Sequence, residues 1–142
     1  MFTLQHQDED IEYEFEKGGY TVEDSKLYIS IETKAIDNEA FPDCFKFALD
    51  GYPINENIKN SIIKINTNPE DVPPNVYVYT TFHACEVEAN ITINKTSSNE
   101  IEVELEVISE DVNYYNEKAK PNPFIGKVSL QQKSLGELWI PS

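Results

Sequence analysis

The sequence predicts a mainly β fold, either an antiparallel β-sandwich or a strongly curled sheet, with at most one or two short helices. Three observations support this prediction. Residues 84–109 hold two runs of alternating apolar and polar side chains, separated by a polar break. Shorter runs elsewhere in the chain alternate in the same way, and turn-forming residues stand between them. Many short strands separated by turns are typical of antiparallel sandwiches and curled sheets.

The run at residues 100–107 shows the clearest alternation. Its apolar side consists of Ile101, Val103, Leu105 and Val107, and its acidic side of Glu100, Glu102, Glu104 and Glu106. Successive side chains of a strand point to opposite faces, so the pattern predicts a strand with one buried face and one acidic face. The run at residues 85–93 alternates likewise, with Glu86 and Glu88 on its polar side. The polar residues 95–99 between the runs predict a hairpin loop.

Two pairing registers of this hairpin keep its apolar residues on one face. Directly opposite residues share a face, so the paired residue numbers must sum to an even value. One register pairs Ile93 with Ile101, and the other pairs Thr92 with Glu100. Each sets Glu88 opposite a glutamate of the second run and places no lysine among the carboxylates. Opposed like charges destabilise a sheet by up to roughly 1 kcal/mol per pair, so we interpret this acidic face as a candidate binding surface.

A second acidic stripe is predicted near the start of the chain, at residues 10–16. Its apolar residues, predicted to face inward, are Ile11, Tyr13 and Phe15, and its outward residues include Glu12 and Glu14. The glycines in Lys17-Gly18-Gly19 predict a tight turn, because glycine tolerates positive φ. Residues 20–23 would then return as a short strand that pairs Phe15 with Val22.

The middle of the chain predicts two strands and one ambiguous segment. Residues 26–34 alternate as a strand, and residues 44–49 form an apolar strand that the Asp50-Gly51 pair would close as a turn. Residues 54–66 fit either a helical face or a β-branched strand, and a helical turn followed by a strand at residues 61–65 is favoured.

The remaining segments predict two more strands and a short helical turn. Residues 76–84 are apolar on both sides, which indicates a strand that is buried on both faces or lies in a central position of the sheet. Residues 124–130 predict the last strand. Ser134 is a candidate cap for a helical turn that runs through Leu138 and Trp139.

Length and charge restrict the classes of partner. The chain has 142 residues, enough for one domain spanning residues 1–142, and carries a formal charge of -15. Its 11 basic residues are all lysine. This composition argues against nucleic acid and anionic membranes as partners, because both require clustered cations. The natural complement is a basic protein, with the chain itself a monomer or small homo-oligomer.

The chain is expected to be cytoplasmic. No apolar stretch approaches the roughly 20 residues of a membrane span, and the first residues do not resemble a secretion signal. Two cysteines, Cys44 and Cys85, do not form a disulfide framework, so free thiols are expected.

No motif predicts catalysis, a cofactor or a metal. His83-Ala-Cys85 places two metal-ligand types on one strand face but has no second spaced pair. No serine lies in a nucleophile motif, and no glycine-rich loop is suited to phosphate. The chain is therefore not expected to be an enzyme.

These observations favour a non-catalytic protein-binding module, most concretely an acidic inhibitor such as a bacterial immunity protein that neutralises a basic toxin or nuclease. The alternatives are a sandwich module that binds a small ligand or carbohydrate, and a subunit of a larger assembly. The candidate partner-binding residues are Glu86, Glu88, Glu102, Glu104, Glu106, Glu12 and Glu14.

Overall fold

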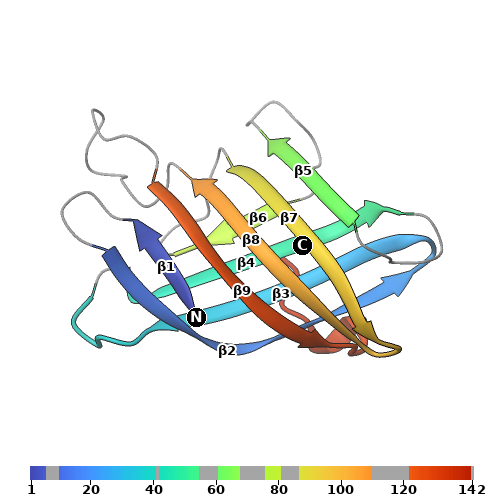
Figure 1. The fold of residues 1–142 in the computed structure, drawn as a ribbon, viewed down its shortest axis with the longest axis horizontal. Helices are drawn as coiled ribbons and strands as arrows, with labels where there is room; N and C mark the ends of the chain where they lie inside the picture. Colours follow the sequence, from blue (N-terminus) through green and yellow to red (C-terminus); the bar gives the residue numbers. More distant parts are fainter. Residues whose placement is uncertain are drawn as a thin grey trace.

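The computed structural model describes residues 1–5, 10–40, 42–54, 61–67, 76–80, 87–109 and 122–141. In these residues the chain forms one antiparallel sheet of nine strands in the order β5-β7-β8-β9-β1-β2-β3-β4-β6 (Figure 1). The strands are β1 (Phe2–Gln5), β2 (Asp10–Glu23), β3 (Lys26–Ala35), β4 (Cys44–Pro53), β5 (Ser61–Thr67), β6 (Val76–Tyr79), β7 (Val87–Ser97), β8 (Glu100–Ser109) and β9 (Asn122–Gln131). The prediction of a mainly β, curled antiparallel sheet is confirmed.

The sheet is built from two runs of consecutive hairpins. Strands β1 to β4 form one run and β7 to β9 the other, and the pairing of β9 with β1 joins them. Strand β6 adds to β4 and β5 adds to β7 at the two edges. Strand β6 also returns into contact with β7, so the sheet curls until its two halves face each other (Figure 1).

Aromatic rings fill the space between the two halves. Phe124 of β9 stacks on Phe45 of β4 with ring centroids 3.8 Å apart, and on Phe2 of β1 at 5.2 Å. The ring of Tyr13 meets Phe124 edge-on at 5.6 Å. Strands β4 and β9 are not neighbours in the sheet, so the Phe45–Phe124 contact spans the interior. Side chains of the inner faces therefore form a packed core.

The predicted turn at Gly18-Gly19 is wrong. Strand β2 runs through both glycines and turns only at Asp24 and Ser25, whose φ angles are 52° and 62°. Positive φ at both central residues is typical of a two-residue hairpin turn that matches sheet twist. Val22 consequently pairs with Leu27 rather than with a residue of its own strand.

The glycines of β2 serve close packing. A Cβ at Gly18 would lie 2.1 Å from the carbonyl oxygen of Ser30, so no larger residue fits this twisted part of the sheet. A bulge between Phe15 and Lys17 precedes it. Phe15, predicted to face inward, is 38% exposed beside this bulge. Bulges increase twist and re-aim side chains, which accounts for the departure.

The turn predicted at Asp50-Gly51 is a bulge within a continuous strand instead. Strand β4 continues through Asp50-Gly51 to Pro53, and its register against β3 shifts by one residue between Leu27 and Ile29. Gly51 adopts φ 69° there. Glycine in the left-handed region commonly marks a bulge as well as a turn, so the sequence signal was ambiguous.

The strand predicted at residues 76–84 is β6 over Val76–Tyr79, but the predicted central position is wrong, because β6 lies at an edge of the sheet with Tyr77 and Tyr79 only half-buried. The remaining sequence predictions divide between confirmed strands and segments outside the described residues. Strands near residues 26–34, 61–65 and 124–130 are confirmed as β3, β5 and β9. The C-terminal helical turn is a short 3-10 helix, η2 (Leu135–Glu137), which begins after Ser134. Residues 55–60 and 81–86, which include the favoured helical turn, lie outside the described residues.

The last segment, residues 132–141, crosses the outer face of the sheet, and we call it the C-terminal strap. The amide of Lys133 donates a hydrogen bond to the Tyr20 carbonyl at 2.9 Å, and the amide of Trp139 donates one to the Ser30 hydroxyl at 3.1 Å. Ser30 points away from the core yet is fully buried. The strap therefore covers the outer face of β2 and β3 around Gly19 and Ser30.

Candidate protein-binding surface

The β7–β8 hairpin adopts a register that neither sequence alternative contained. Asn90 pairs with Glu106, Thr92 with Glu104 and Asn94 with Glu102. The two residue numbers of each pair sum to an even value, so the apolar residues of both strands share one face, as predicted. The strands are nevertheless shifted relative to both predicted registers. Glu88 pairs with Ile108 and not with a glutamate. The prediction that carboxylates oppose one another across this hairpin is therefore wrong.

The turn explains the shift. The sequence predicted a loop over residues 95–99, whereas the strands continue to Ser97 and resume at Glu100, with one extra residue between Lys95 and Ser97. The hydroxyl of Thr96, in this bulge, donates a hydrogen bond to Glu100 Oε1 at 2.9 Å. A bulge beside a tight turn alters the register in a way that strand alternation does not reveal.

The glutamates of β8 are also partly compensated by a lysine, contrary to the prediction. Lys127 of β9 lies directly opposite Glu104, but its Nζ forms an ion pair with Glu102 at 3.2 Å. Asn90 Nδ2 donates a hydrogen bond to Glu106 Oε1 at 3.3 Å. Glu104 is exposed and, within the described part of the chain, makes no hydrogen bond or ion pair.

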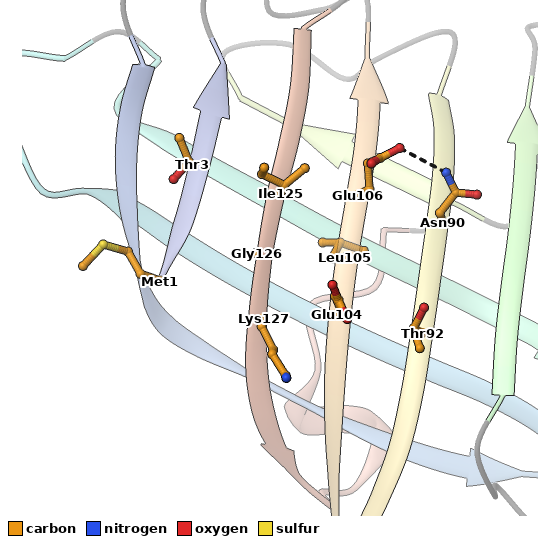
Figure 2. Close-up of a pocket in the computed structure, with 10 residues that line it drawn as sticks. All are labelled: Met1, Thr3, Asn90, Thr92, Glu104, Leu105, Glu106, Ile125, Gly126 and Lys127. Carbon is orange, nitrogen blue, oxygen red and sulfur yellow. Dashed lines mark hydrogen bonds between the residues drawn. The ribbon is translucent and has the colours of Figure 1, made fainter.

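A trough of about 550 Å³ crosses the outer face of β7, β8, β9 and β1 (Figure 2). We call it the outer trough, and its lining residues are Met1, Thr3, Asn90, Thr92, Glu104, Leu105, Glu106, Ile125, Gly126 and Lys127. The register aligns Asn90, Glu106, Ile125 and Thr3 in one row across the strands. It aligns Thr92, Glu104 and Lys127 in the next row. Figure 2 shows both rows, with the Asn90–Glu106 hydrogen bond at one side of the trough.

The two acidic stripes lie on the same face of the sheet. Glu12 of β2 pairs with Thr3, which in turn pairs with Ile125, so Glu12 extends the row that contains Glu106. Glu14 is exposed and pairs with Lys34 of β3. Strands β8 and β2 are separated only by β9 and β1. Glu86 lies outside the described residues.

Sequence reasoning missed the middle of this surface. Thr3, Ile125 and Lys127 belong to strands from the two ends of the chain, which meet only because β9 pairs with β1. A candidate signal was Gly126 within the last strand, because a Cβ there would lie 2.2 Å from the Phe2 ring. Glycine inside a strand often marks such a close approach.

The outer trough is suited to binding polar and cationic groups. Its described lining contains carboxylates, an amide, hydroxyls, a lysine and three apolar residues, Met1, Leu105 and Ile125, but no aromatic residue. Among the described residues, no cluster of histidine, cysteine, aspartate and glutamate side chains has the geometry of a metal site. His83 and Cys85 lie outside the described residues.

Titratable groups with shifted pKa values lie away from the trough. Burial raises the pKa of the Tyr13 hydroxyl, which donates a hydrogen bond to the Pro42 carbonyl at 2.5 Å. Cys44 is a free thiol that donates to the Thr80 carbonyl at 3.4 Å, and burial, with Asp43 beside it, raises its pKa. A raised pKa keeps both groups neutral, so neither is activated for chemistry.

Comparison of the chain with protein-family models, curated proteins and solved structures found no match. No helix in the described ranges has the length and apolar character needed to cross a membrane.

Proposed function

We propose that the protein is a non-catalytic module that binds a basic protein, most concretely an immunity-type inhibitor that neutralises a basic toxin or nuclease in the bacterial cytoplasm. The observation that supports this proposal is the shared outer face of the two acidic stripes. Glu12, Glu104 and Glu106 are exposed there around an open trough. The free thiol of Cys44 agrees with a reducing compartment.

Charge gives this surface a physical role in recognition. A formal charge of -15 attracts cationic proteins over several ångströms and raises association rates, which fall as salt increases. A nuclease must hold phosphates with lysine and arginine, so its active-site surface is complementary to an acidic face. An inhibitor of such an enzyme needs only to occupy that surface and requires no chemistry of its own.

The geometry gives less support to a small-ligand or carbohydrate module. Such sites are concave pockets that enclose most of the ligand and commonly contain aromatic side chains. The outer trough is open and has no aromatic lining among its described residues, and the stacked Phe45 and Phe124 rings fill the interior. A subunit of a larger assembly remains the other alternative, and size-exclusion chromatography distinguishes it from a monomeric inhibitor.

The test is affinity purification of the tagged protein from its own cells, followed by reconstitution with the purified partner. A variant with Glu12, Glu14, Glu104 and Glu106 changed to glutamine is the matched comparison. We expect a stoichiometric basic partner whose affinity falls with salt, falls at least tenfold in the variant, and whose activity the wild-type protein inhibits. A partner that is acidic, or whose binding is unaffected by the four substitutions, would refute the proposal.

A further inference from the structure

We propose that the outer trough seats an arginine side chain of the partner protein between Glu104 and Glu106. This inference rests on the proposed function and specifies which part of the acidic face makes the central contact. It concerns an open sheet face rather than a pocket within the core, and its occupant is a basic segment of another protein.

The spacing of the two glutamates suits a single cation. Glu104 and Glu106 lie two residues apart on the outer face of β8, which separates their Cα atoms by about 6.6 Å. Their side chains are long enough for one guanidinium to reach both carboxylates. The hydrogen bond from Asn90 Nδ2 holds Glu106 on the trough side (Figure 2).

The lysine in the described lining of the trough is engaged elsewhere. Lys127 lies opposite Glu104 in the sheet, yet its Nζ is 3.2 Å from Glu102. Glu104 therefore keeps an exposed carboxylate that forms no ion pair with the described parts of the chain. A cation from a partner protein would complete the row without displacing the Lys127–Glu102 ion pair.

The surrounding groups favour arginine over lysine. The Thr92 hydroxyl lies in the same lining, and together with the two carboxylates it supplies more acceptor sites than the three N–H donors of a lysine can fill. The guanidinium has five N–H donors in a plane and binds carboxylates in bidentate fashion. The side chains of Ile125 and Met1 offer apolar contact to the aliphatic stem of the arginine.

Part of the other half of the outer face, around Gly19 and Ser30, is already covered by the chain itself. There the C-terminal strap lies on β2 and β3, and Lys46 Nζ sits 5.7 Å from the ring centroids of both Tyr79 and Trp139. Two carboxylates, those of Glu104 and Glu106, line the outer trough, and the lysine of its described lining, Lys127, is already paired with Glu102. Charge complementarity therefore directs a basic partner to the trough.

The direct test uses two short peptides, acetyl-Ala-Arg-Ala-Arg-Ala-amide and its lysine counterpart, titrated into the isotopically labelled protein and followed by NMR. We expect saturable shifts at Glu104, Leu105, Glu106 and the Asn90 side-chain amide, with the arginine peptide binding at least threefold tighter than the lysine peptide. Equal affinity for the two peptides, or shifts of similar size over all acidic residues, would overturn the inference.

Matched variants separate the trough from general acidity. The double substitution Glu104→Gln and Glu106→Gln should lower the affinity for the arginine peptide about fivefold, because each exposed carboxylate contributes about a factor of two to three to the affinity. The control pair Glu23→Gln and Glu39→Gln changes the net charge equally at exposed sites away from the trough, and should change affinity less than 1.5-fold. Equal weakening by the two pairs would contradict a specific seat.

Failure of this inference is distinguishable from failure of the proposed function. If the purified partner loses affinity with Glu12→Gln and Glu14→Gln but not with the Glu104 and Glu106 substitutions, the arginine seat is wrong and the inhibitor proposal stands. If the partner responds to neither pair, both proposals are wrong. Far-ultraviolet circular dichroism and thermal midpoints of every variant confirm that each is folded.

Discussion

The outer face of this sheet has two halves that differ in how their polar positions are used. Over β7, β8, β9 and β1 the outward side chains are carboxylates, amides and hydroxyls that line an open trough. Over β2 and β3 the outward positions include Gly19 and Ser30, both buried beneath the C-terminal strap. The inner faces of both halves belong to the same core.

This difference shows that an outward-facing position of the sheet can be either exposed to solvent or covered by another segment of the chain. Outward residues that are charged, such as Glu104, remain exposed, whereas small outward residues such as Gly19, Ser30 and Ala48 mark a surface that another segment covers. A Cβ at Gly19 would lie 2.9 Å from the carbonyl oxygen of Gln131, where the chain leaves β9 and crosses β2. The covered half should therefore be sensitive to side-chain size, and the open half to charge.

The largest effect is expected from Gly18→Ala in the covered half. The added Cβ would lie 2.1 Å from a backbone oxygen of Ser30, and φ at Gly18 is +156°, so the strand itself must move. We expect a loss of about 3 kcal/mol or more in the free energy of unfolding, measured by urea denaturation. Gly136→Ala is the control, because nothing lies within 4 Å of its Cβ position, and it should change stability by less than about 0.5 kcal/mol. Similar stabilities for the two variants would mean that β2 is not packed as described.

The next effect is expected from Trp139→Ala in the strap. The indole lies near Tyr79, with ring centroids 6.5 Å apart, and near the Lys46 ammonium. Because Trp139 is only partly buried, we expect a loss of about 2 kcal/mol, below the range for a fully buried tryptophan. Increased amide exchange of Ser30 and its neighbours on β3 should accompany it. Unchanged exchange there would show that the strap does not protect the outer face of β3.

A smaller effect, dependent on pH, is expected from Tyr13→Phe in the shared core. The phenylalanine keeps the edge contact with Phe124 but leaves the Pro42 carbonyl without its hydrogen bond, at a cost of about 1 to 2 kcal/mol at neutral pH. Burial raises the folded-state pKa of Tyr13 above its ordinary value of 10.0. Stabilisation by the neutral hydroxyl is therefore complete below pH 10 and is lost as the pH rises further.

Urea denaturation between pH 7 and pH 11 tests the pH dependence. The stability of the wild-type protein should fall as the pH rises above 10, and the Tyr13→Phe variant should fall less steeply, so the two curves converge at high pH. Some decline should remain in the variant, because burial also raises the pKa values of Tyr20 and Cys44. Parallel curves would show that the Tyr13 hydroxyl ionises equally well in both states.

Much of the fold could be predicted from side-chain alternation alone. The strands with one buried face, such as residues 100–107, are confirmed, because alternation reports directly which face is buried. Two glycine-containing dipeptides, Gly18-Gly19 and Asp50-Gly51, were wrongly predicted to be turns. The same backbone freedom serves bulges and close approaches, and only the neighbouring strand shows which one is present.

The acidic residues of the candidate surface could be identified from the sequence, but its other residues and its arrangement could not. Glu12, Glu104 and Glu106 were identified from the sequence, and all three are exposed on the outer face. Their neighbours depend on the β9–β1 pairing, which joins segments far apart in the sequence, and on a bulge at Thr96, which side-chain alternation does not reveal. Lys127, whose ammonium forms an ion pair with Glu102, belongs to the surface because β8 pairs with β9, which no local pattern revealed.

The smallest effect on stability is expected from Glu104→Gln combined with Glu106→Gln in the open half. Glu102, Glu104 and Glu106 repeat along one face of β8, and only Glu102 has an ion pair among the described residues. Removing two charges from a chain of net charge -15 should raise the free energy of unfolding by about 0.5 kcal/mol at low salt, and the gain should shrink in 0.5 M NaCl. Lys127→Gln should lower the free energy of unfolding by a similar amount, because it leaves Glu102 unpaired.

If the glutamine pair instead destabilises the protein by more than 1 kcal/mol, these carboxylates support the fold itself, and their exposure in the trough no longer argues for a partner. If the glutamine pair stabilises the protein but weakens binding of the arginine peptide, the two negative charges favour binding and oppose folding. The open half would then keep these charges for recognition at a cost in stability, a cost that the covered half does not have.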